Sequence, residues 1–236
     1  MAATLPGGRE KVKPEHVMPK KTASRTKRPG DERWTGAELA VLEELRSPRQ
    51  VQERLDSIPY SPDPIYRSPR RVLRDRKAHC FDGALFAAAA LARLGHPPLL
   101  VDLRAVNDDD HVIAVYKVDG HWGAVAKSNF VGLRFREPIH RTLRELALSY
   151  FELYFNTLGQ KTLREYSLPL DLRAFDDIDW RTSDQDLERI ATRLDELRHF
   201  PLLTRRMVAR LSPVDERSVK AGMLGADEAG LFKPKK

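Results

Sequence analysis

The chain has 236 residues, a net charge of +7 and a single cysteine, Cys80. This length suits one ordinary domain with appendages. One cysteine excludes an internal disulfide framework and any metal site built from several cysteines, so we expect a reducing, cytoplasmic location. The N-terminus has no signal-peptide core, and no apolar run is long enough to span a bilayer, so we expect no membrane contact.

The positive charge is concentrated in the tails. Residues 1–29 hold eight Lys or Arg against two Glu, and three of the last four residues are lysines, so the rest of the chain carries a net charge of about −2. A nucleic-acid binder acting through the tail and the basic segment 67–77 is therefore the least favoured functional class, and we expect no nucleic-acid partner.

The composition divides the chain into a tail and one domain. Residues 1–32 are rich in Lys, Pro, Gly, Thr and Ser and have almost no apolar periodicity, which predicts a disordered basic tail. Residues 33–232 are expected to form a single α+β domain. Its core is expected over about residues 70–130, and its C-terminal helices over 141–225.

Helix signals come first in the domain. Residues 36–45 predict a short helix, and Ser47 followed by Pro48 predicts the start of a second helix that ends near Asp56. Four prolines between residues 59 and 69 then predict an extended connector. Six Arg or Lys residues lie between 67 and 77, and they suit either a solvated connector or a contact with an acidic substrate or phosphate.

The middle of the chain predicts a buried helix followed by a hairpin. Residues 79–91 are apolar on nearly all sides, as in a buried helix that Gly95 would end. Strands are expected over residues 99–103, 111–118 and 121–127, with a tight Asp119-Gly120 turn between the last two. Further helices are expected over residues 142–155, 183–198 and 202–211.

The hairpin turn fixes a register in which Val118 pairs with His121 and His111 faces Ser128. His111 then shares a face with Ile113. If the small-residue face of the buried helix packs on that face, Cys80 meets His111. The residues of that helix face are Cys80, Ala84, Ala87, Ala88 and Leu91.

This meeting would have chemical consequences. A helix N-terminus favours a thiolate over a thiol, because its N–H groups are unpaired and its dipole end is positive. A neighbouring histidine can take the thiol proton, as acyl transfer by a cysteine requires. A lone cysteine in an apolar helix is otherwise a small buried hydrophobe.

Three motifs appear in order along this region: Cys80-Phe81-Asp82-Gly83-Ala84, Asp110-His111-Val112 and Asp119-Gly120-His121-Trp122. In order and spacing they resemble the transglutaminase-like branch of the papain-like cysteine enzymes. The resemblance covers about residues 70–130, a quarter of the chain. It implies an α+β fold in which a buried helix headed by the cysteine packs on a small antiparallel sheet.

The resemblance also implies a function. Cys80 would be the nucleophile and His111 its general base in acyl transfer or hydrolysis of a peptide or amide, with no cofactor and no metal. The family expects an acidic residue a few positions after the Trp, where this chain has Ala126. Ser128, which the register places opposite His111, or Asn129, which would recreate a Cys-His-Asn arrangement, could replace it in orienting the imidazole. The alternatives are a Cys-His dyad or no catalysis.

Other features stay open at this stage. The Cys80 N–H would form half of an oxyanion hole, with Tyr60, Gln50 or Gln52 as candidate second donors. An inactive member of the fold, used for binding or scaffolding, is the main alternative function. The run Asp108–His111 is a poor metal site, because consecutive residues entering a strand cannot all converge on one ion. The sequence does not specify the substrate, the acyl acceptor or the oligomeric state.

Overall fold

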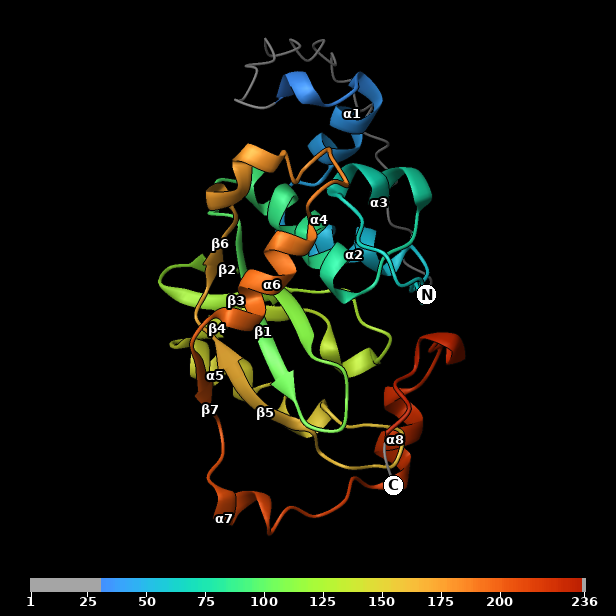
Figure 1. Cartoon of the computed structure of the whole chain (residues 1–236), viewed down its shortest axis with the longest axis vertical. Coiled ribbons are helices and arrows are strands. Elements are labelled where there is room, and N and C mark those ends of the chain that lie inside the picture. The colour runs from blue at the N-terminus through green and yellow to red at the C-terminus, as the bar shows by residue number, and fades with distance from the viewer. Residues whose placement is uncertain (1–30, 235–236) are drawn as a thin grey trace, which may run out of the picture.

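The computed structural model in Figure 1 describes residues 31–234, so the expected tail over residues 1–32 lies almost entirely outside the described residues. The first described element, η1 (Asp31–Arg33), is a 3-10 turn. Its buried Asp31 forms an ion pair with Arg93. Residues 31 and 32 therefore belong to the folded part rather than to the tail.

The described strands form one antiparallel sheet with helices around it, which confirms the expected α+β class. The strand order is β4-β3-β2-β1-β5-β7, and the short β6 also pairs with β1. The strands are β1 (Leu99–Ala105), β2 (His111–Val118), β3 (His121–Val125), β4 (Arg136–His140), β5 (Leu163–Ser167), β6 (Leu170–Asp171) and β7 (His199–Pro201).

The β2–β3 hairpin has the register that its turn predicts. Val118 pairs with His121, and the ladder continues to Ala114 opposite Val125. Asp119 (φ 48°) and Gly120 (φ 79°) both adopt the left-handed conformation that a two-residue hairpin turn requires. The strand β3 ends at Val125, so the expected position of Ser128 opposite His111 lies beyond the ladder.

Three helices before the sheet begin at capped turns. Ser47 accepts a hydrogen bond from the backbone N–H of Gln50, and Pro48 follows at the first position, as the sequence predicts. Ser68 and Pro69 repeat this signal at a third helix that the proline-rich connector concealed. These helices are α1 (Gly36–Glu44), α2 (Pro48–Asp56) and α3 (Pro69–Asp75).

The buried helix predicted from the apolar run is α4 (Cys80–Arg93). It crosses close to the chain after β3, where an ideal Cβ on Gly83 would come within 2.3 Å of the Lys127 Cβ. Only glycine leaves room for this approach. Just after the helix, Gly95 has a φ of 94°, the left-handed conformation that ends helices.

The sheet is covered on both faces. On one face α4, α2 and α6 (Glu188–Glu196) pack against a surface that includes Val112 and Ala114. On the other face α5 (Leu143–Leu148) and η3 (Phe151–Leu153) pack against Ile113 and Val115. The expected packing of α4 on the Ile113 face is therefore wrong: the helix lies on the opposite face.

The C-terminal part contains less helix than its periodicity predicts. Three helices were expected over residues 142–155, 183–198 and 202–211, but α5, α6 and α7 (Arg205–Val208) are shorter, and strands β5, β6 and β7 lie between them. After β7 the chain passes through α7 and α8 (Glu216–Gly222) to a last turn, η5 (Glu228–Gly230) (Figure 1). No helix between residues 31 and 234 combines the length and the apolar composition needed to cross a bilayer.

Candidate active site

A cavity of about 630 Å³ lies where β2 begins and α4 starts. Its walls come from segments that are far apart in sequence: the connector 60–66, the first residues of α4, the loop 108–112, the chain after β3, and the C-terminal residues 229–232. Both Cys80 and His111 line it. The two residues on which the sequence analysis depends therefore share one cavity.

Cys80 is the first residue of α4 and is half-buried. Its sulfur contacts the carbonyl oxygen of Asp110 at 3.9 Å. Burial raises the pKa of the Cys80 thiol to about 12, and the Asp109 carboxylate acts in the same direction, whereas the backbone N–H groups of Val112 and Phe81 lower the pKa. The helix N-terminus thus fails to compensate for burial, and the thiol is neutral at pH 7.

His111 is buried at the start of β2. Its Nε2 lies 2.8 Å from the carbonyl oxygen of Leu133, and its ring meets those of Tyr150 and Tyr154 edge-on. Burial lowers the pKa of His111 to about 4. A carbonyl oxygen only accepts, so Nε2 carries the proton of the neutral ring and Nδ1 is left as a base.

The cysteine and the histidine approach the cavity from different sides. The His111 ring contacts the α5 side of the sheet, whereas the Cys80 sulfur lies on the α4 side, beside the backbone of Asp110 and Val112. Between residues 31 and 234, the thiol donates to the Asp110 carbonyl, the backbone N–H groups of Val112 and Phe81 face its sulfur, and no hydrogen bond joins it to the His111 ring.

The residues predicted to orient His111 have other partners. The Ser128 hydroxyl oxygen accepts a hydrogen bond from the backbone N–H of Phe130 at 3.0 Å. The Asn129 side chain binds the backbone of Asp227. Ala126, where the resemblance implies an acidic residue, is fully buried. The acceptor at His111 Nε2 is instead a backbone carbonyl.

Among the oxyanion-hole candidates, Tyr60 lies at the site. Tyr60 lines the cavity, and the backbone of Cys80 lies close enough to its hydroxyl group to lower the pKa of that hydroxyl against the effect of burial. Burial raises the pKa of Tyr60, so the hydroxyl keeps its proton. Gln52 instead pairs with the backbone N–H and carbonyl of Ala126, and Gln50 accepts from the N–H of Arg46.

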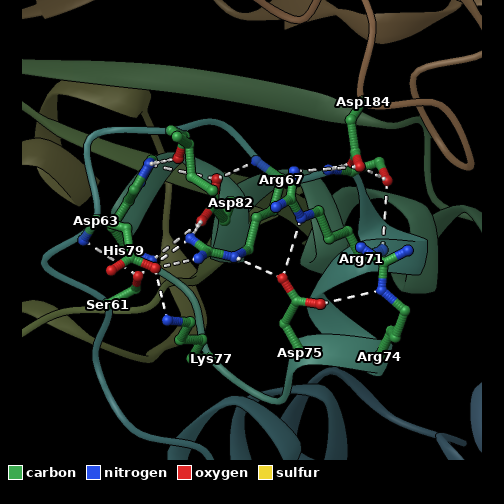
Figure 2. Close-up of polar contacts among 12 residues, drawn as sticks. Ser61, Asp63, Arg67, Arg71, Arg74, Asp75, Lys77, His79, Asp82 and Asp184 are labelled. Atoms are coloured by element: carbon green, nitrogen blue, oxygen red, sulfur yellow. Dashed lines mark hydrogen bonds and ion pairs between the residues drawn. The ribbon is translucent and has the colours of Figure 1, made fainter.

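An ion-pair network holds the first turn of α4 (Figure 2). The fully buried Asp82 accepts hydrogen bonds from the backbone N–H groups of Arg67 (2.7 Å) and His79 (3.3 Å), and it pairs with the Arg67 guanidinium. Arg67 is itself buried and also pairs with Asp63 and Asp75. The basic segment 67–77 was expected either to be solvated or to contact an acidic substrate or phosphate. Arg67 does neither, because its side chain is buried in ion pairs with aspartates of the protein.

The aspartates of the cavity wall bind protein groups. The Asp108 carboxylate accepts from the Thr162 hydroxyl at 2.7 Å, and Asp110 accepts from the backbone N–H of Ala105 at 2.7 Å. Asp102 pairs with His199 at 2.9 Å. Within the described part of the chain, no group of three or more His, Cys, Asp or Glu side chains is arranged to hold a metal ion.

Sequence reasoning missed three parts of this site. The Leu133 carbonyl is a backbone group without a residue signature, and the C-terminal segment 229–232 reaches the cavity only through the tertiary fold. Arg67 was visible as one member of a basic run. No feature of that run distinguished the buried arginine from its exposed neighbours.

No protein-family model and no curated protein matches this chain. Solved structures of LapG from Legionella pneumophila resemble 41% of the chain at 17% sequence identity, with TM-scores of 0.32 for one structure and 0.31 for a calcium-bound one. The matched part covers 63% of the first LapG chain and 62% of the calcium-bound chain. The chain therefore spans less than two thirds of these structures.

Proposed function

We propose that the protein is a transglutaminase-like cysteine enzyme that hydrolyses an amide or peptide bond, or transfers its acyl group, through Cys80 and His111. The observation that carries this proposal is the shared cavity: the thiol, a histidine with an available Nδ1, and a Tyr60 hydroxyl beside the Cys80 N–H all border one space. These are the groups that nucleophilic catalysis by a cysteine needs.

The proposed reaction follows from these positions. His111 Nδ1 accepts the thiol proton while the Cys80 sulfur forms a bond to the substrate carbonyl carbon. The Cys80 N–H and the Tyr60 hydroxyl stabilise the negative oxygen. The imidazolium then returns the proton to the leaving amine, the C–N bond breaks, and water or an amine attacks the thioester. The Leu133 carbonyl holds His111 in the required tautomer, the role that Ser128 or Asn129 was expected to fill.

The reaction requires a hydrogen bond between the thiol and the imidazole, which the described part of the structure does not contain. Catalytic hydrogen bonds are often long in free enzymes and shorten when substrate binds. The His111 ring is held on one side by Leu133 and two tyrosine rings, so we expect the Cys80 side chain and the loop before β2 to move.

Acylation of Cys80 tests the proposal. The probe is p-nitrophenyl acetate, and intact-mass spectrometry with peptide mapping measures the rate at which Cys80 is acetylated at pH 7. A general base contributes about 10²- to 10⁴-fold, so His111→Ala should slow the reaction by at least 100-fold. His121→Ala is the matched control, because the His121 ring bonds the carbonyl of Asp119 in its own turn and, among the described residues, has no other side-chain hydrogen bond, so we expect this variant to react at the wild-type rate.

The second candidate function is an inactive binding module of the same fold. Among the described residues the thiol and the imidazole share no hydrogen bond, and each has another partner, which favours this candidate. Equal acylation rates for the wild type, His111→Ala and His121→Ala, rising only with the thiolate fraction, would overturn catalysis and favour the binding module.

A further inference from the structure

The C-terminal segment, residues 227–232, forms one wall of the cavity that holds Cys80. Residues Ala229 to Phe232 line the cavity directly. The segment follows α8, which contacts the short turn η2 (Val131–Leu133) and lies near the C-terminal end of the chain (Figure 1). The wall of the proposed substrate cleft is therefore made by the chain's own last described turn.

Asn129 binds this segment through backbone atoms alone. Its side-chain nitrogen donates to the carbonyl oxygen of Asp227 at 2.9 Å, and its side-chain oxygen accepts from the Asp227 N–H at 2.8 Å. One amide thus satisfies both polar backbone groups of one residue. Such a contact recognises a peptide main chain and does not depend on the side chain.

Three residues further on, the segment fits only as glycine. An ideal Cβ on Gly230 would lie 2.8 Å from two carbons of the Tyr60 ring and 3.2 Å from the Asn129 side-chain nitrogen. The φ of Gly230 is not positive, so the requirement comes from space and not from backbone conformation. Tyr60 and Asn129 therefore form a surface against which a bare backbone packs.

The segment adds little to the core. No residue after Leu203 belongs to either buried hydrophobic cluster among the described residues. The side chains of Asp227, Glu228 and Ala229 are exposed. The nearest firm anchor is at the end of α8, where Gly222 lies against the Phe155 ring. The segment can therefore leave the cavity without opening the core.

We propose that Asn129 and Tyr60 form a binding subsite for a glycine-containing peptide backbone, and that residues 227–232 occupy this subsite in the free protein. The inference deepens the proposed function, on which it rests, by naming the substrate class of the same cleft. It also gives Asn129 a role in peptide binding instead of orienting His111. A tethered segment has an effective concentration in the millimolar range, so it excludes weak peptides and admits tight ones.

Peptide binding to the full chain tests this inference. The probe is a fluorescein-labelled hexapeptide with the sequence of residues 227–232, and fluorescence anisotropy measures its dissociation constant. All chains carry Cys80→Ser, so no covalent step contributes. Gly230→Ala places a methyl group against Tyr60 and displaces the chain's own segment. Gly36→Ala is the matched control, because no atom lies within 4 Å of its added Cβ.

We expect the Gly230→Ala chain to bind the probe at least tenfold more tightly than the wild type or Gly36→Ala. A probe with alanine at the position of Gly230, or the further substitution Asn129→Asp, should weaken binding to that chain at least tenfold. Asn129→Asp keeps the acceptor and loses the donor to the Asp227 carbonyl.

Equal affinities for the three chains, or for the two probes, would overturn the subsite. This test and the acetylation test have separate outcomes. Selective peptide binding without His111-dependent acylation of Cys80 supports the subsite and contradicts the proposed enzyme function. Acylation without selective peptide binding supports the enzyme function and contradicts the subsite.

Discussion

The ion-pair network around Arg67 makes the sharpest stability prediction. Arg67→Met removes the guanidinium and keeps a side chain of similar length. Asp63 retains its pair with Lys77, and Asp75 retains Arg71 and Arg74, so these two carboxylates lose little. Asp82 is fully buried and loses the only Arg or Lys partner that it has in the described structure.

Removing one partner of a buried ion pair costs about 3–5 kcal/mol. Two backbone N–H groups still bind Asp82, so we expect the lower end, about 3 kcal/mol. For a chain of this size that loss lowers Tm by about 6–12 °C. Urea unfolding followed by tryptophan fluorescence and by circular dichroism measures the difference in the free energy of unfolding.

Arg74→Met is the matched control, since the Arg74 side chain is 64% exposed and, within residues 31–234, forms its ion pair with Asp75 alone. We expect a loss below about 1 kcal/mol there. The double variant Arg67→Met, Asp82→Asn should be no less stable than Arg67→Met alone, because it removes a buried charge whose remaining partners are the His79 ring and two backbone N–H groups. A loss at Arg67 no larger than at Arg74, or a double variant much less stable than the single one, would refute this reasoning.

Other predictions concern the sheet and its surroundings. Burial keeps His111 neutral in the folded chain down to about pH 4, whereas an unfolded histidine binds a proton near pH 6.5. The free energy of unfolding should therefore decrease as the pH is lowered from about 6.5 to 4, by about 3 kcal/mol in total. In urea unfolding at pH 7 and pH 4.5, His111→Gln should remove this slope and His121→Gln should keep it; an unchanged slope in His111→Gln contradicts the assignment. Gly83→Ala should lower the free energy of unfolding by about 1–3 kcal/mol, because the added Cβ would overlap with Lys127. Gly36→Ala, where the added Cβ meets no atom, should lose none, and equal stabilities of the two variants would show that α4 shifts freely.

The elements predicted correctly are those with local signals. The cap at Ser47, the apolar run of α4 and the Asp119-Gly120 turn each act within a few residues, and the structure has a helix or hairpin at each. The same cap-and-proline signal at Ser68 was hidden, because neighbouring prolines indicated a connector. The short strands β4 to β7 have no regular alternation of polar and apolar residues in their sequences, so only their pairing in the sheet defines them.

The face on which α4 packs was not readable from sequence. Residues 112 to 116 of β2 are buried on both faces, and Val112 and Ala114 are as apolar as Ile113 and Val115. A strand buried on both sides has no polar-apolar alternation to mark the face that meets a given helix. The prediction used the odd-numbered face because His111 is on it, and α4 lies on the other.

The hypothesis that Cys80 meets His111 assumed that α4 packs on the odd-numbered face of β2. That assumption is wrong, but both residues still line one cavity. Cys80 is the first residue of its helix and His111 the first of its strand. At the rim, where both elements begin, the sheet no longer separates its two faces, and the cavity lies there. Under the proposed function, we expect the loop before β2 to control the approach of the sulfur to the imidazole, because the Cys80 thiol contacts the Asp110 carbonyl there. The Asp110 carboxylate also ties that loop to the N–H of Ala105, so we expect loosening of this tie, and not repacking of α4, to bring the two groups together.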